Sequence, residues 1–352
     1  MSFNIAIIGY GGMGGWHADF IRSSLPEMNL KGVWDIRPER LEAAREKGIF
    51  TYESEDQLLF DPEIDLVTIA TPNNFHKPLA IKALNAGKNA VSEKPVMMNA
   101  AELEEVMKAA EKSGKIFTVH QNRRWDKDFC TVKNIIDGNI IGKPHFIESR
   151  VLGSRRVLCG WRGYKIDGGG MLLDWGVHLI DQLMWMNKTP VVNVYAELLT
   201  IAEKCEVDDN IKIHLTFADG LHAMVQVANH CFIPLPRWHV SCEYGTAVVE
   251  DWDANGKIVR LASEDEMAWD ESICYTAAGP TRTMAPRPTE TIETLELPVA
   301  DPHLTDFYRN VAAATRGEAE LIVKPGEALR VMKVIDLAFE SGEKKKSISC
   351  LI

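Results

Sequence analysis

The first 120 residues alternate short, continuous apolar runs with segments of helical periodicity. The apolar runs cover residues 5–8, 30–34, 66–70, 89–92 and 116–120. A strand that is buried on both faces of a parallel sheet has such a continuous run, whereas a half-exposed strand alternates apolar and polar residues. The repeated order of strand, helix and strand predicts an α/β fold with a doubly wound parallel sheet in residues 1–122.

Two of the intervening helices have recognisable ends. Asn99 is a predicted N-cap, because Glu102 follows three residues later in a capping-box pattern, and Gly114 is the predicted stop. A shorter helix is predicted over residues 78–86, with Gly87 closing it.

Apolar and polar residues alternate in the second half of the chain, in segments 145–152, 191–199, 211–217 and 221–227. Asp219-Gly220 between the last two segments is a strong hairpin signal. We therefore expect residues 123–352 to form a second domain with a mostly antiparallel sheet.

The C-terminal part of this second domain has a different pattern. Residues 262–292 are polar and rich in proline, so a long loop or arm is predicted there. Two helices are predicted to close the chain and to pack back on the first domain. The last of them is predicted to begin at Pro325 and to end at Gly342.

Composition and charge exclude several classes of protein. The chain has 352 residues, a length that favours about two domains, and 39 Lys and Arg against 50 Asp and Glu give a net charge of −11. Its one basic run, residues 344–346, is short, so no nucleic-acid partner is predicted. No apolar stretch approaches the roughly 18 residues of a membrane span, so no membrane association is predicted. The seven cysteines lack C-x-x-C spacing and no export signal is recognisable, so a cytoplasmic location is expected.

A glycine-rich turn follows the first apolar run and opens a helical segment; its residues are Gly9, Tyr10, Gly11, Gly12, Met13 and Gly14. The G-x-G-x-x-G pattern in this position is typical of a Rossmann dinucleotide-binding loop. Glycine allows the tight turn and the close approach of a pyrophosphate, and the helix N-terminus offers free amides to the phosphates.

The residue that ends the second apolar run points to the cofactor. Asp35 lies about 20 residues after the glycine turn, where a carboxylate accepts a hydrogen bond from a ribose 2′-hydroxyl and repels a 2′-phosphate. NAD is therefore the predicted cofactor. Arg37 is able to accept a 2′-phosphate, so NADP stays open as the less favoured alternative.

Polar segments follow three further apolar runs. They are Thr71-Pro72-Asn73 with His76, then Glu93-Lys94-Pro95, and then residues 120–126. Ligands of open parallel sheets bind beyond the carboxyl ends of the strands, so these segments are expected to share one crevice. Helix capping is an alternative role for any one of them, notably for Thr71.

Residues 167–186 predict an apolar helix with titratable groups along one face. Asp174, His178 and Asp181 are spaced i, i+4 and i+7, after the glycines at 168–170. One interpretation is a half-exposed polar stripe. Another is a carboxylate that orients an imidazole for proton transfer. A metal site lacks nearby ligands of suitable spacing, so no metal is predicted.

Taken together, these motifs resemble those of the Gfo/Idh/MocA oxidoreductases, which include glucose–fructose oxidoreductase and inositol dehydrogenase. The markers are the glycine turn, the segments at 71–76, 93–95 and 122–124, and the glycines and Asp/His helix at 168–181. The match covers nearly the whole chain. The resemblance implies a C-terminal α/β domain with a large open sheet, which commonly forms the interface of a homo-oligomer, here a dimer, tetramer or hexamer.

The resemblance also implies an activity and its residues. It implies that Lys94, Asp174 and His178 form the catalytic group. We expect His178 to act as the base, Asp174 to fix its tautomer and Lys94 to bond the reacting oxygen. Thr71, Asn73 and Glu93 are expected to hold the nicotinamide, with Pro72 and His76 as further candidate cofactor contacts. Trp161 and Arg162 resemble a segment near the cofactor in some members.

The expected partner is a small molecule that offers a secondary hydroxyl: a sugar, a glycoside (with glucose-type C3 oxidation favoured) or a cyclitol such as inositol. Candidate substrate contacts are Asn122, Arg124, Trp125, Arg155, Tyr164 and Asp181. Three other functions stay open: an inositol 2-dehydrogenase, a hydrolase or epimerase with transient redox chemistry on tightly bound NAD, and an NAD sensor without turnover.

Overall fold

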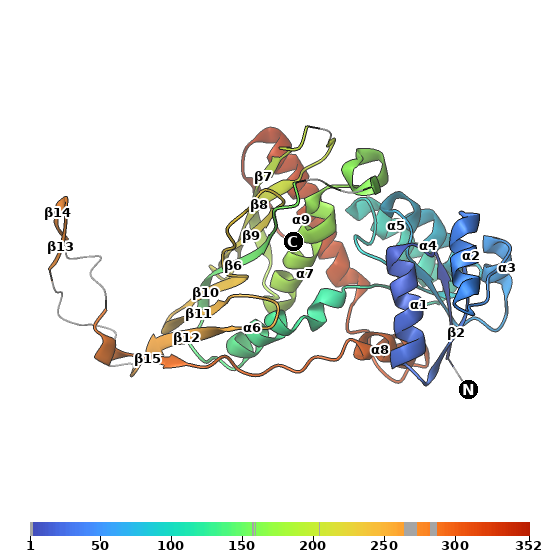
Figure 1. Ribbon diagram of the computed structural model, residues 1–352, viewed down its shortest axis with the longest axis horizontal. Helices are drawn as coiled ribbons and strands as arrows, with labels where there is room; N and C mark the ends of the chain where they lie inside the picture. The colour runs from blue at the N-terminus through green and yellow to red at the C-terminus, as the bar shows by residue number, and fades with distance from the viewer. Residues whose placement is uncertain (1–2, 157, 159, 204, 264–272, 282–286) are drawn as a thin grey trace.

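Two sheets organise the protein. The computed structural model describes residues 3–156, 158, 160–203, 205–263, 273–281 and 287–352. Figure 1 shows the N-terminal sheet with its helices at one end of the molecule and a larger sheet at the other, with helices α7 and α9 between them. The α/β class, with a Rossmann-type parallel sheet followed by a large sheet, is confirmed.

The N-terminal sheet has five parallel strands in the order β2-β1-β3-β4-β5. The strands are β1 (Phe3–Ile8), β2 (Met28–Trp34), β3 (Leu66–Ile69), β4 (Asn89–Ser92) and β5 (Phe117–Val119). All residues of β3 and β5 are buried, as the continuous apolar runs predict for strands covered on both faces.

Helices and short turns connect these strands: α1 (Gly12–Ser24), α2 (Pro38–Glu46), α3 (Glu55–Phe60), η1 (Asn73–Phe75), α4 (His76–Asn85) and α5 (Ala100–Ser113). The predicted ends of α5 are confirmed. The Asn99 side chain accepts a hydrogen bond from the Glu102 N–H, and Gly114 is left-handed with φ 65°. Helix α4 begins two residues earlier than predicted, at His76.

The larger sheet is mixed and mostly antiparallel, in the order β15-β12-β11-β10-β6-β9-β8-β7-β16, with β6 and β9 parallel. Its strands are β6 (Pro144–Leu152), β7 (Val191–Leu199), β8 (Asn210–Phe217), β9 (His222–Ala228), β10 (Trp238–Cys242), β11 (Gly245–Val249), β12 (Gly256–Leu261), β15 (Ile292–Leu295) and β16 (Ile348–Ser349). Residues alternate between buried and more exposed along β8 and β9, so one face packs on the core. The predicted hairpin joins these two strands, with Gly220 at φ 89°.

The chain between the two sheets carries the segments that reach the cleft. They are η2 (Asn122–Trp125), α6 (Lys127–Asp137), η3 (Gly160–Gly163), η4 (Lys165–Asp167), the π-helical turn η5 (Leu172–Gly176) and α7 (Val177–Met186). Residues 167–186 are therefore not one continuous α-helix, because a wider π turn precedes α7.

Helices α8 (Thr305–Thr315) and α9 (Pro325–Lys344) close the chain, as predicted. Helix α9 contacts β7 and α7 on one side and α5 and β5 on the other. The prediction that Gly342 ends α9 is wrong: the helix continues to Lys344, and Lys345 is the left-handed residue. A Cβ at Gly342 would lie 2.9 Å from Leu198 Cγ, so this glycine provides close packing against β7.

The predicted loop at 262–292 contains some regular structure. A hairpin of β13 (Cys274–Thr276) and β14 (Gly279–Thr281) lies within it, followed by η7 (Thr289–Thr291) and β15. Residues 264–272 and 282–286 of that prediction lie outside the described residues. Among the helices the structure describes, none is long and apolar enough to span a membrane.

Candidate active site

A cleft of about 690 Å³ opens at the carboxyl ends of the parallel strands, where the segments after β1, β3 and β4 come together. The segment 120–126, which was expected to share this crevice, does not line it. Predicted site residues that line it are Gly9, Gly11, Gly12, Met13, Asp35, Arg37, Thr71, Pro72, Asn73, Glu93, Lys94, Trp161, Arg162 and Asp174. The cleft runs from the β2 side of the sheet, where Asp35 lies, to the β4 side, where Lys94 lies.

The glycine turn has the shape that a dinucleotide requires. Gly9 has φ 91°, and a Cβ there would lie 2.6 Å from Ala70 O. A Cβ at Gly14 would lie 1.8 Å from Gly9 O, so this glycine lets α1 pack on the turn. Gly11 and Gly12 face open space within the cleft, where phosphates are able to approach the N-terminus of α1.

Asp35 lies at the β2 end of the cleft and is 8% exposed. Its Oδ2 accepts a hydrogen bond from the Tyr10 N–H (2.7 Å) and its Oδ1 accepts one from the Arg37 N–H (2.9 Å). Tyr10 contributes its backbone, because its side chain is buried in the core. Arg37 and Arg40 line the same end, so a carboxylate and two cations lie where a ribose would bind.

The segment after β3 supplies both cleft and supporting residues. Thr71 Oγ1 is buried without a hydrogen-bond partner among the described residues, as expected of an atom that awaits a ligand. Asn73 Nδ2 donates to Gly168 O (2.7 Å). The prediction that His76 binds cofactor is wrong in this structure: its buried ring lies between the carbonyl oxygens of Pro95 (2.9 Å) and Thr71 (3.0 Å), so it ties two cleft segments together.

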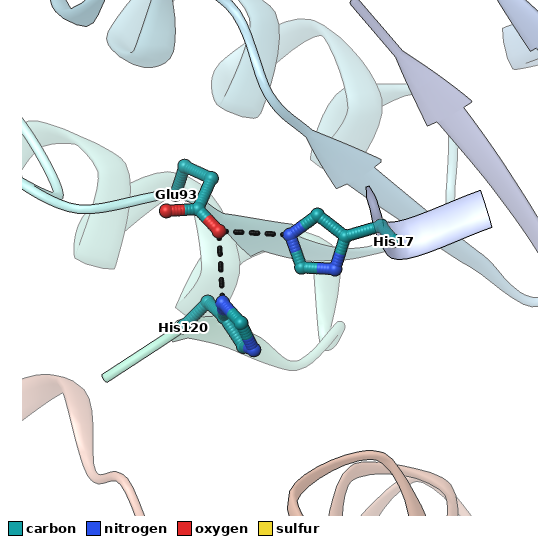
Figure 2. A group of neighbouring side chains, drawn as sticks. All are labelled: His17, Glu93 and His120. Atoms are coloured by element: carbon teal, nitrogen blue, oxygen red, sulfur yellow. Dashed lines mark hydrogen bonds and ion pairs between the residues drawn. The ribbon is translucent and has the colours of Figure 1, made fainter. Parts of the chain in front are cut away.

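Glu93 ends β4 and is 5% exposed. Its Oε1 lies 2.8 Å from His17 Nε2 and 2.8 Å from His120 Nδ1, as Figure 2 shows. Burial raises the pKa of Glu93, but the two histidines outweigh it and hold the pKa well below its usual value. Among the described residues, His17, Glu93 and His120 are the group whose side-chain types suit a metal ion. The two contacts of Glu93 with the histidines have the lengths of ordinary hydrogen bonds. The absence of a metal stays a prediction.

Lys94 and Asp174 meet at the β4 end of the cleft. Lys94 Nζ donates to Asp174 Oδ1 (2.7 Å) and to the Asp174 backbone oxygen (2.6 Å). Asp174 Oδ2 accepts from Arg162 Nε (3.1 Å). Burial raises the pKa of Asp174, but the two cations outweigh it and hold this pKa below its usual value. One carboxylate therefore orients two cations that line the cleft.

His178 lies on α7 and is 3% exposed. Its Nδ1 lies 3.0 Å from Gln121 Oε1; since an amide oxygen only accepts, Nδ1 carries the proton. Burial lowers the pKa of His178, and the charges of Lys94 and Arg123 lower it further, to well below the usual value. The ring is thus neutral near pH 7, with its lone pair on Nε2.

This arrangement corrects the predicted role of Asp174. The spacing predicted that Asp174 orients His178, but its carboxylate bonds Lys94 and Arg162, and Gln121 orients His178. The π turn at residues 172–176 breaks the i, i+4 register between the two side chains.

The glycines at 168–170 bring this turn close to the rest of the cleft. A Cβ at Gly168 would lie 2.5 Å from Met98 Sδ, and one at Gly169 would lie 2.2 Å from Arg162 O. A Cβ at Gly170 would lie 2.5 Å from the Asp208 carboxylate. The close backbone approach expected of these glycines is therefore present, and it places Asp174 beside Lys94.

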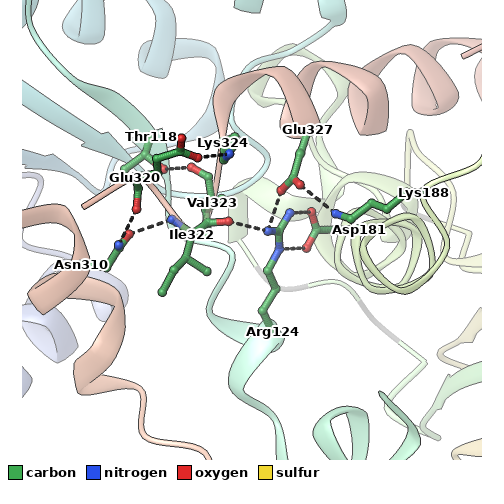
Figure 3. Close-up of polar contacts among 10 residues, drawn as sticks. All are labelled: Thr118, Arg124, Asp181, Lys188, Asn310, Glu320, Ile322, Val323, Lys324 and Glu327. Carbon is green, nitrogen blue, oxygen red and sulfur yellow. Dashed lines mark hydrogen bonds and ion pairs between the residues drawn. The ribbon is translucent and has the colours of Figure 1, made fainter. Parts of the chain in front are cut away.

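The predicted substrate contacts Arg124 and Asp181 pair with each other instead. Arg124 donates to both carboxylate oxygens of Asp181 (2.8 and 2.7 Å), and their side chains are 1% and 2% exposed. Figure 3 shows that Arg124 also reaches Ile322 O and Glu327. The pair therefore ties η2 and α7 to the start of α9, and the prediction of substrate contact is corrected to a structural role.

The other predicted substrate residues are scattered. Trp125 packs edge-on against Phe307 of α8, with ring centroids 5.9 Å apart, so its role is in packing. Arg155 and Tyr164 are exposed, and Asn122 is half-buried at the start of η2. Trp161 lines the cleft beside Arg162, whose guanidinium lies 4.7 Å from the Trp161 ring.

Four residues near His178 were missed by the sequence analysis. Gln121 bonds its ring, and Trp175 packs edge-on to it with centroids 5.9 Å apart. The Arg123 guanidinium lies between Trp175 (4.6 Å) and Trp252 (5.2 Å). Gln121 and Trp175 adjoin the motifs, so their position was a usable signal. Trp252 lies far along the chain from these motifs, so its position in the sequence gave no such signal.

The comparisons with known proteins agree with this geometry. Residues 3–121 match the family model described as "Oxidoreductase family, NAD-binding Rossmann fold", and residues 129–248 match the model of the GFO/IDH/MocA C-terminal domain. A solved structure of an NAD-binding protein from Listeria innocua is 40% identical, with a TM-score of 0.94 over 99% of each chain.

Two enzymes are more distant relatives. The scyllo-inositol 2-dehydrogenase (NADP(+)) IolW of Bacillus subtilis is 28% identical over 354 residues, which cover 99% of this chain and 96% of the relative. The myo-inositol 2-dehydrogenase of Thermotoga maritima is 29% identical over 195 residues, which cover 55% of this chain and 57% of the relative. Because family models match both halves of the sequence, this chain belongs to the Gfo/Idh/MocA family of oxidoreductases, with an NAD(P)-binding Rossmann domain.

Proposed function

We propose that the protein is an NAD-dependent dehydrogenase that oxidises a secondary hydroxyl of a cyclitol, sugar or glycoside. The observation that carries this proposal is the contact between Lys94 and Asp174 at one end of the cleft, beside the neutral His178. A proton donor, a fixed carboxylate and a proton acceptor thus converge where the cleft of the Rossmann domain ends.

The residues that hold NAD are those of the cleft. The glycine turn takes the pyrophosphate, Asp35 takes the ribose hydroxyls, and Thr71 with its free Oγ1 lies nearer the β4 end. When bound there, NAD⁺ supplies the hydride acceptor for alcohol oxidation. We favour NAD because of Asp35, although Arg37 and Arg40 lie close by.

His178 is the proposed base. An alcohol loses a hydride as its hydroxyl proton leaves, so a group must take that proton. His178 is buried and does not itself line the cleft, but the charge of Lys94, which does line it, acts on its ring. With Nδ1 bonded to Gln121, the Nε2 of His178 has a lone pair and no proton, and the lowered pKa keeps it unprotonated near pH 7.

Lys94 is the proposed stabiliser of the reacting oxygen. Its ammonium is held by two contacts to Asp174, and its third N–H is able to bond the substrate oxygen as negative charge develops. Asp174, shared between Lys94 and Arg162, fixes that ammonium in place.

The substrate class rests on the relatives and on the chemistry of the site. Inositol 2-dehydrogenases are among the relatives, so inositols lead the panel of candidates, with glucose-type pyranosides next. Trp175, Trp252 and Arg123 are proposed as a wall for the ring, since aromatic faces and a guanidinium suit a polyhydroxylated ring. Homo-oligomeric assembly and a cytoplasmic location stay predictions.

The test mixes stoichiometric enzyme and NAD⁺ with a panel of inositols, monosaccharides and glycosides. Absorbance of reduced nicotinamide is followed and products are identified by mass. A substrate-dependent rise with a product lighter by two hydrogens is expected. An altered sugar without net reduction supports the transient-redox alternative instead, and no reaction in either direction, with keto-sugars and NADH as the reverse panel, contradicts the proposal.

A further inference from the structure

Glu93 is a buried carboxylate that lines the cofactor cleft. The proposed mechanism does not use it as an acid or a base. Its Oε1 accepts hydrogen bonds from His17 and His120, and its Oε2 accepts one from the Lys94 N–H (3.1 Å). Figure 2 shows both imidazoles directed at the same oxygen. The carboxylate is therefore held by three N–H donors, in one position and in its ionised form.

The hydrogen bonds of His17 show which of its two ring nitrogens carries a proton. Because Glu93 only accepts, His17 Nε2 carries a proton, and His17 Nδ1 accepts from the Tyr308 hydroxyl (2.8 Å). Tyr308 in turn lies 3.2 Å from Thr68 Oγ1, which then donates. His17 is thus a neutral ring with both nitrogens satisfied, and burial lowers its pKa.

The His120 ring has a hydrogen-bond partner at one of its two nitrogens. Its Nδ1 donates to Glu93, and its Nε2 is buried without a hydrogen-bond partner among the described residues. A second N–H there would be buried and unpaired, which costs more than a bare lone pair. The cluster of Glu93, His17 and His120 therefore carries one net negative charge.

The negative charge of this cluster determines the net charge of the groups at the β4 end of the cleft. Lys94, Arg162 and Arg123 contribute three positive charges, Asp174, Glu93 and Asp126 (3.2 Å from Arg123) contribute three negative charges, and His178 is neutral. These groups sum to zero with Glu93 and to +1 without it. The oxidised nicotinamide ring is a cation and the reduced ring is neutral, so the two forms respond differently to that charge.

We propose that Glu93 allows the cleft to accept the cationic, oxidised nicotinamide by cancelling the net positive charge at the β4 end, with His17 and His120 as positioning residues that hold its carboxylate. The inference rests on the proposed function only in that the nicotinamide binds at the β4 end. Its consequence for alcohol oxidation is that the oxidised cofactor binds without a net electrostatic repulsion.

The experiment measures three dissociation constants by calorimetry, without substrate. The probes are NAD⁺, NADH and benzamide adenine dinucleotide, whose ring has the shape of nicotinamide and no charge. In an effective dielectric constant of about 20, one unit charge within about 12 Å changes the relative affinity for cationic and neutral rings by at least about tenfold. The wild type is expected to bind NAD⁺ and the two neutral-ring probes without a charge bias, and E93Q is expected to bind NAD⁺ about tenfold or more weakly relative to both neutral-ring probes.

Two kinds of control separate charge from shape. E55Q removes a carboxylate from the same cleft on the β2 side, where α3 packs, and is expected to change all three constants by similar factors. H120N replaces one N–H donor by an amide N–H donor and keeps the carboxylate with its charge, so the relative affinities are expected to stay within about threefold of the wild type. Equal changes for E93Q and H120N overturn the proposal, because geometry and not charge then sets the relative affinities.

If E93Q does not fold, measurements on the wild-type protein alone still test the proposal. A wild type that binds the benzamide analogue about tenfold or more tightly than NAD⁺ overturns the proposal, because the positive charge is then not cancelled. So does tight Zn²⁺ binding that is lost in H17N and H120N, since a metal would cancel the charge of Glu93. A bias of the wild type against NAD⁺ leaves the proposed dehydrogenase standing, whereas no binding of any probe overturns both.

Discussion

Two buried carboxylates illustrate different uses of burial in this protein. Glu93 beside the cleft is held by two neutral imidazoles and a backbone N–H, so its charge is retained (Figure 2). Asp181 between η2 and α7 is held by a bidentate guanidinium, that of Arg124, so its charge is cancelled (Figure 3). Neutral donors keep a charge available to a ligand, whereas a cation turns the same group into a structural tie.

The difference extends to the elements around each group. The cleft cluster joins α1 to the residues that follow β4 and β5, with short polar contacts that end at Lys94, the proposed catalytic lysine. The second cluster joins η2, α7 and α9, and Lys188 completes it on Glu327 (2.8 Å). We therefore expect substitutions in the first cluster to alter chemistry and cofactor binding, and those in the second to alter the free energy of unfolding.

The largest effect is expected from His178→Ala on the cleft side. Loss of the base lowers turnover by about 100- to 10,000-fold, while NAD⁺ affinity stays within about threefold, because the ring contacts Gln121 and not the glycine turn. Single-turnover kinetics and calorimetry measure the two quantities. H239A, on the large sheet, is the control, and full turnover in H178A contradicts the assignment.

On the structural side, Asp181→Asn leaves the Arg124 cation buried without its full partner. The free energy of unfolding is expected to fall by about 3–5 kcal/mol, as measured by urea denaturation. D137N breaks an exposed pair with Lys133 and is expected to cost less than about 1 kcal/mol. An equal cost for both variants would remove the distinction between the two clusters.

The buried neutral histidines predict how stability depends on pH. Burial lowers the pKa of His17 and His178 in the folded state. Below about pH 6.5 the unfolded chain binds protons that the folded state does not bind, so the free energy of unfolding falls as the pH decreases. Each of the two contributes up to about 1.4 kcal/mol per pH unit.

Urea denaturation between pH 7 and 5.5 measures this slope. H17Q is expected to reduce it, because one buried ring no longer titrates, and H214Q on the more exposed face of β8 is expected to leave it unchanged. A free energy of unfolding that is constant over this range contradicts the assignment of neutral rings.

The smallest effect concerns the β2 end of the cleft. Asp35→Ser removes the carboxylate proposed to bond the ribose, so the dissociation constant for NAD⁺ is expected to rise about tenfold or more, and that for NADP⁺ to fall relative to it. Calorimetry with both cofactors measures the ratio. E39S, an exposed neighbour, is the control; an unchanged ratio in D35S would show that Asp35 does not select the cofactor.

Short-range patterns predicted much of this molecule. The continuous apolar runs located the parallel strands, and the glycine turn and Asp35 located one end of the cleft, because these features depend on residues close together in the chain. The ends of α5 followed from Asn99 and Gly114 for the same reason.

Long-range partners could not be predicted in this way. Spacing placed Asp174, His178 and Asp181 on one face, yet each has a partner from another segment: Lys94, Gln121 and Arg124 respectively. The single π turn at 172–176 changes the register, and no local pattern marks it. His17 and Tyr308, which hold the Glu93 cluster, are 291 residues apart, so their contact emerges only from the fold.

The central distinction between the two clusters is tested most directly by K94M and D181N side by side. For each variant, the single-turnover rate of NAD⁺ reduction per folded molecule and the free energy of unfolding are measured on the same sample. We predict that K94M loses the rate by at least about 100-fold with little change in stability, because Asp174 keeps Arg162. D181N is predicted to lose stability and to retain the rate. The opposite pattern, or an equal loss of both quantities in both variants, would contradict the account.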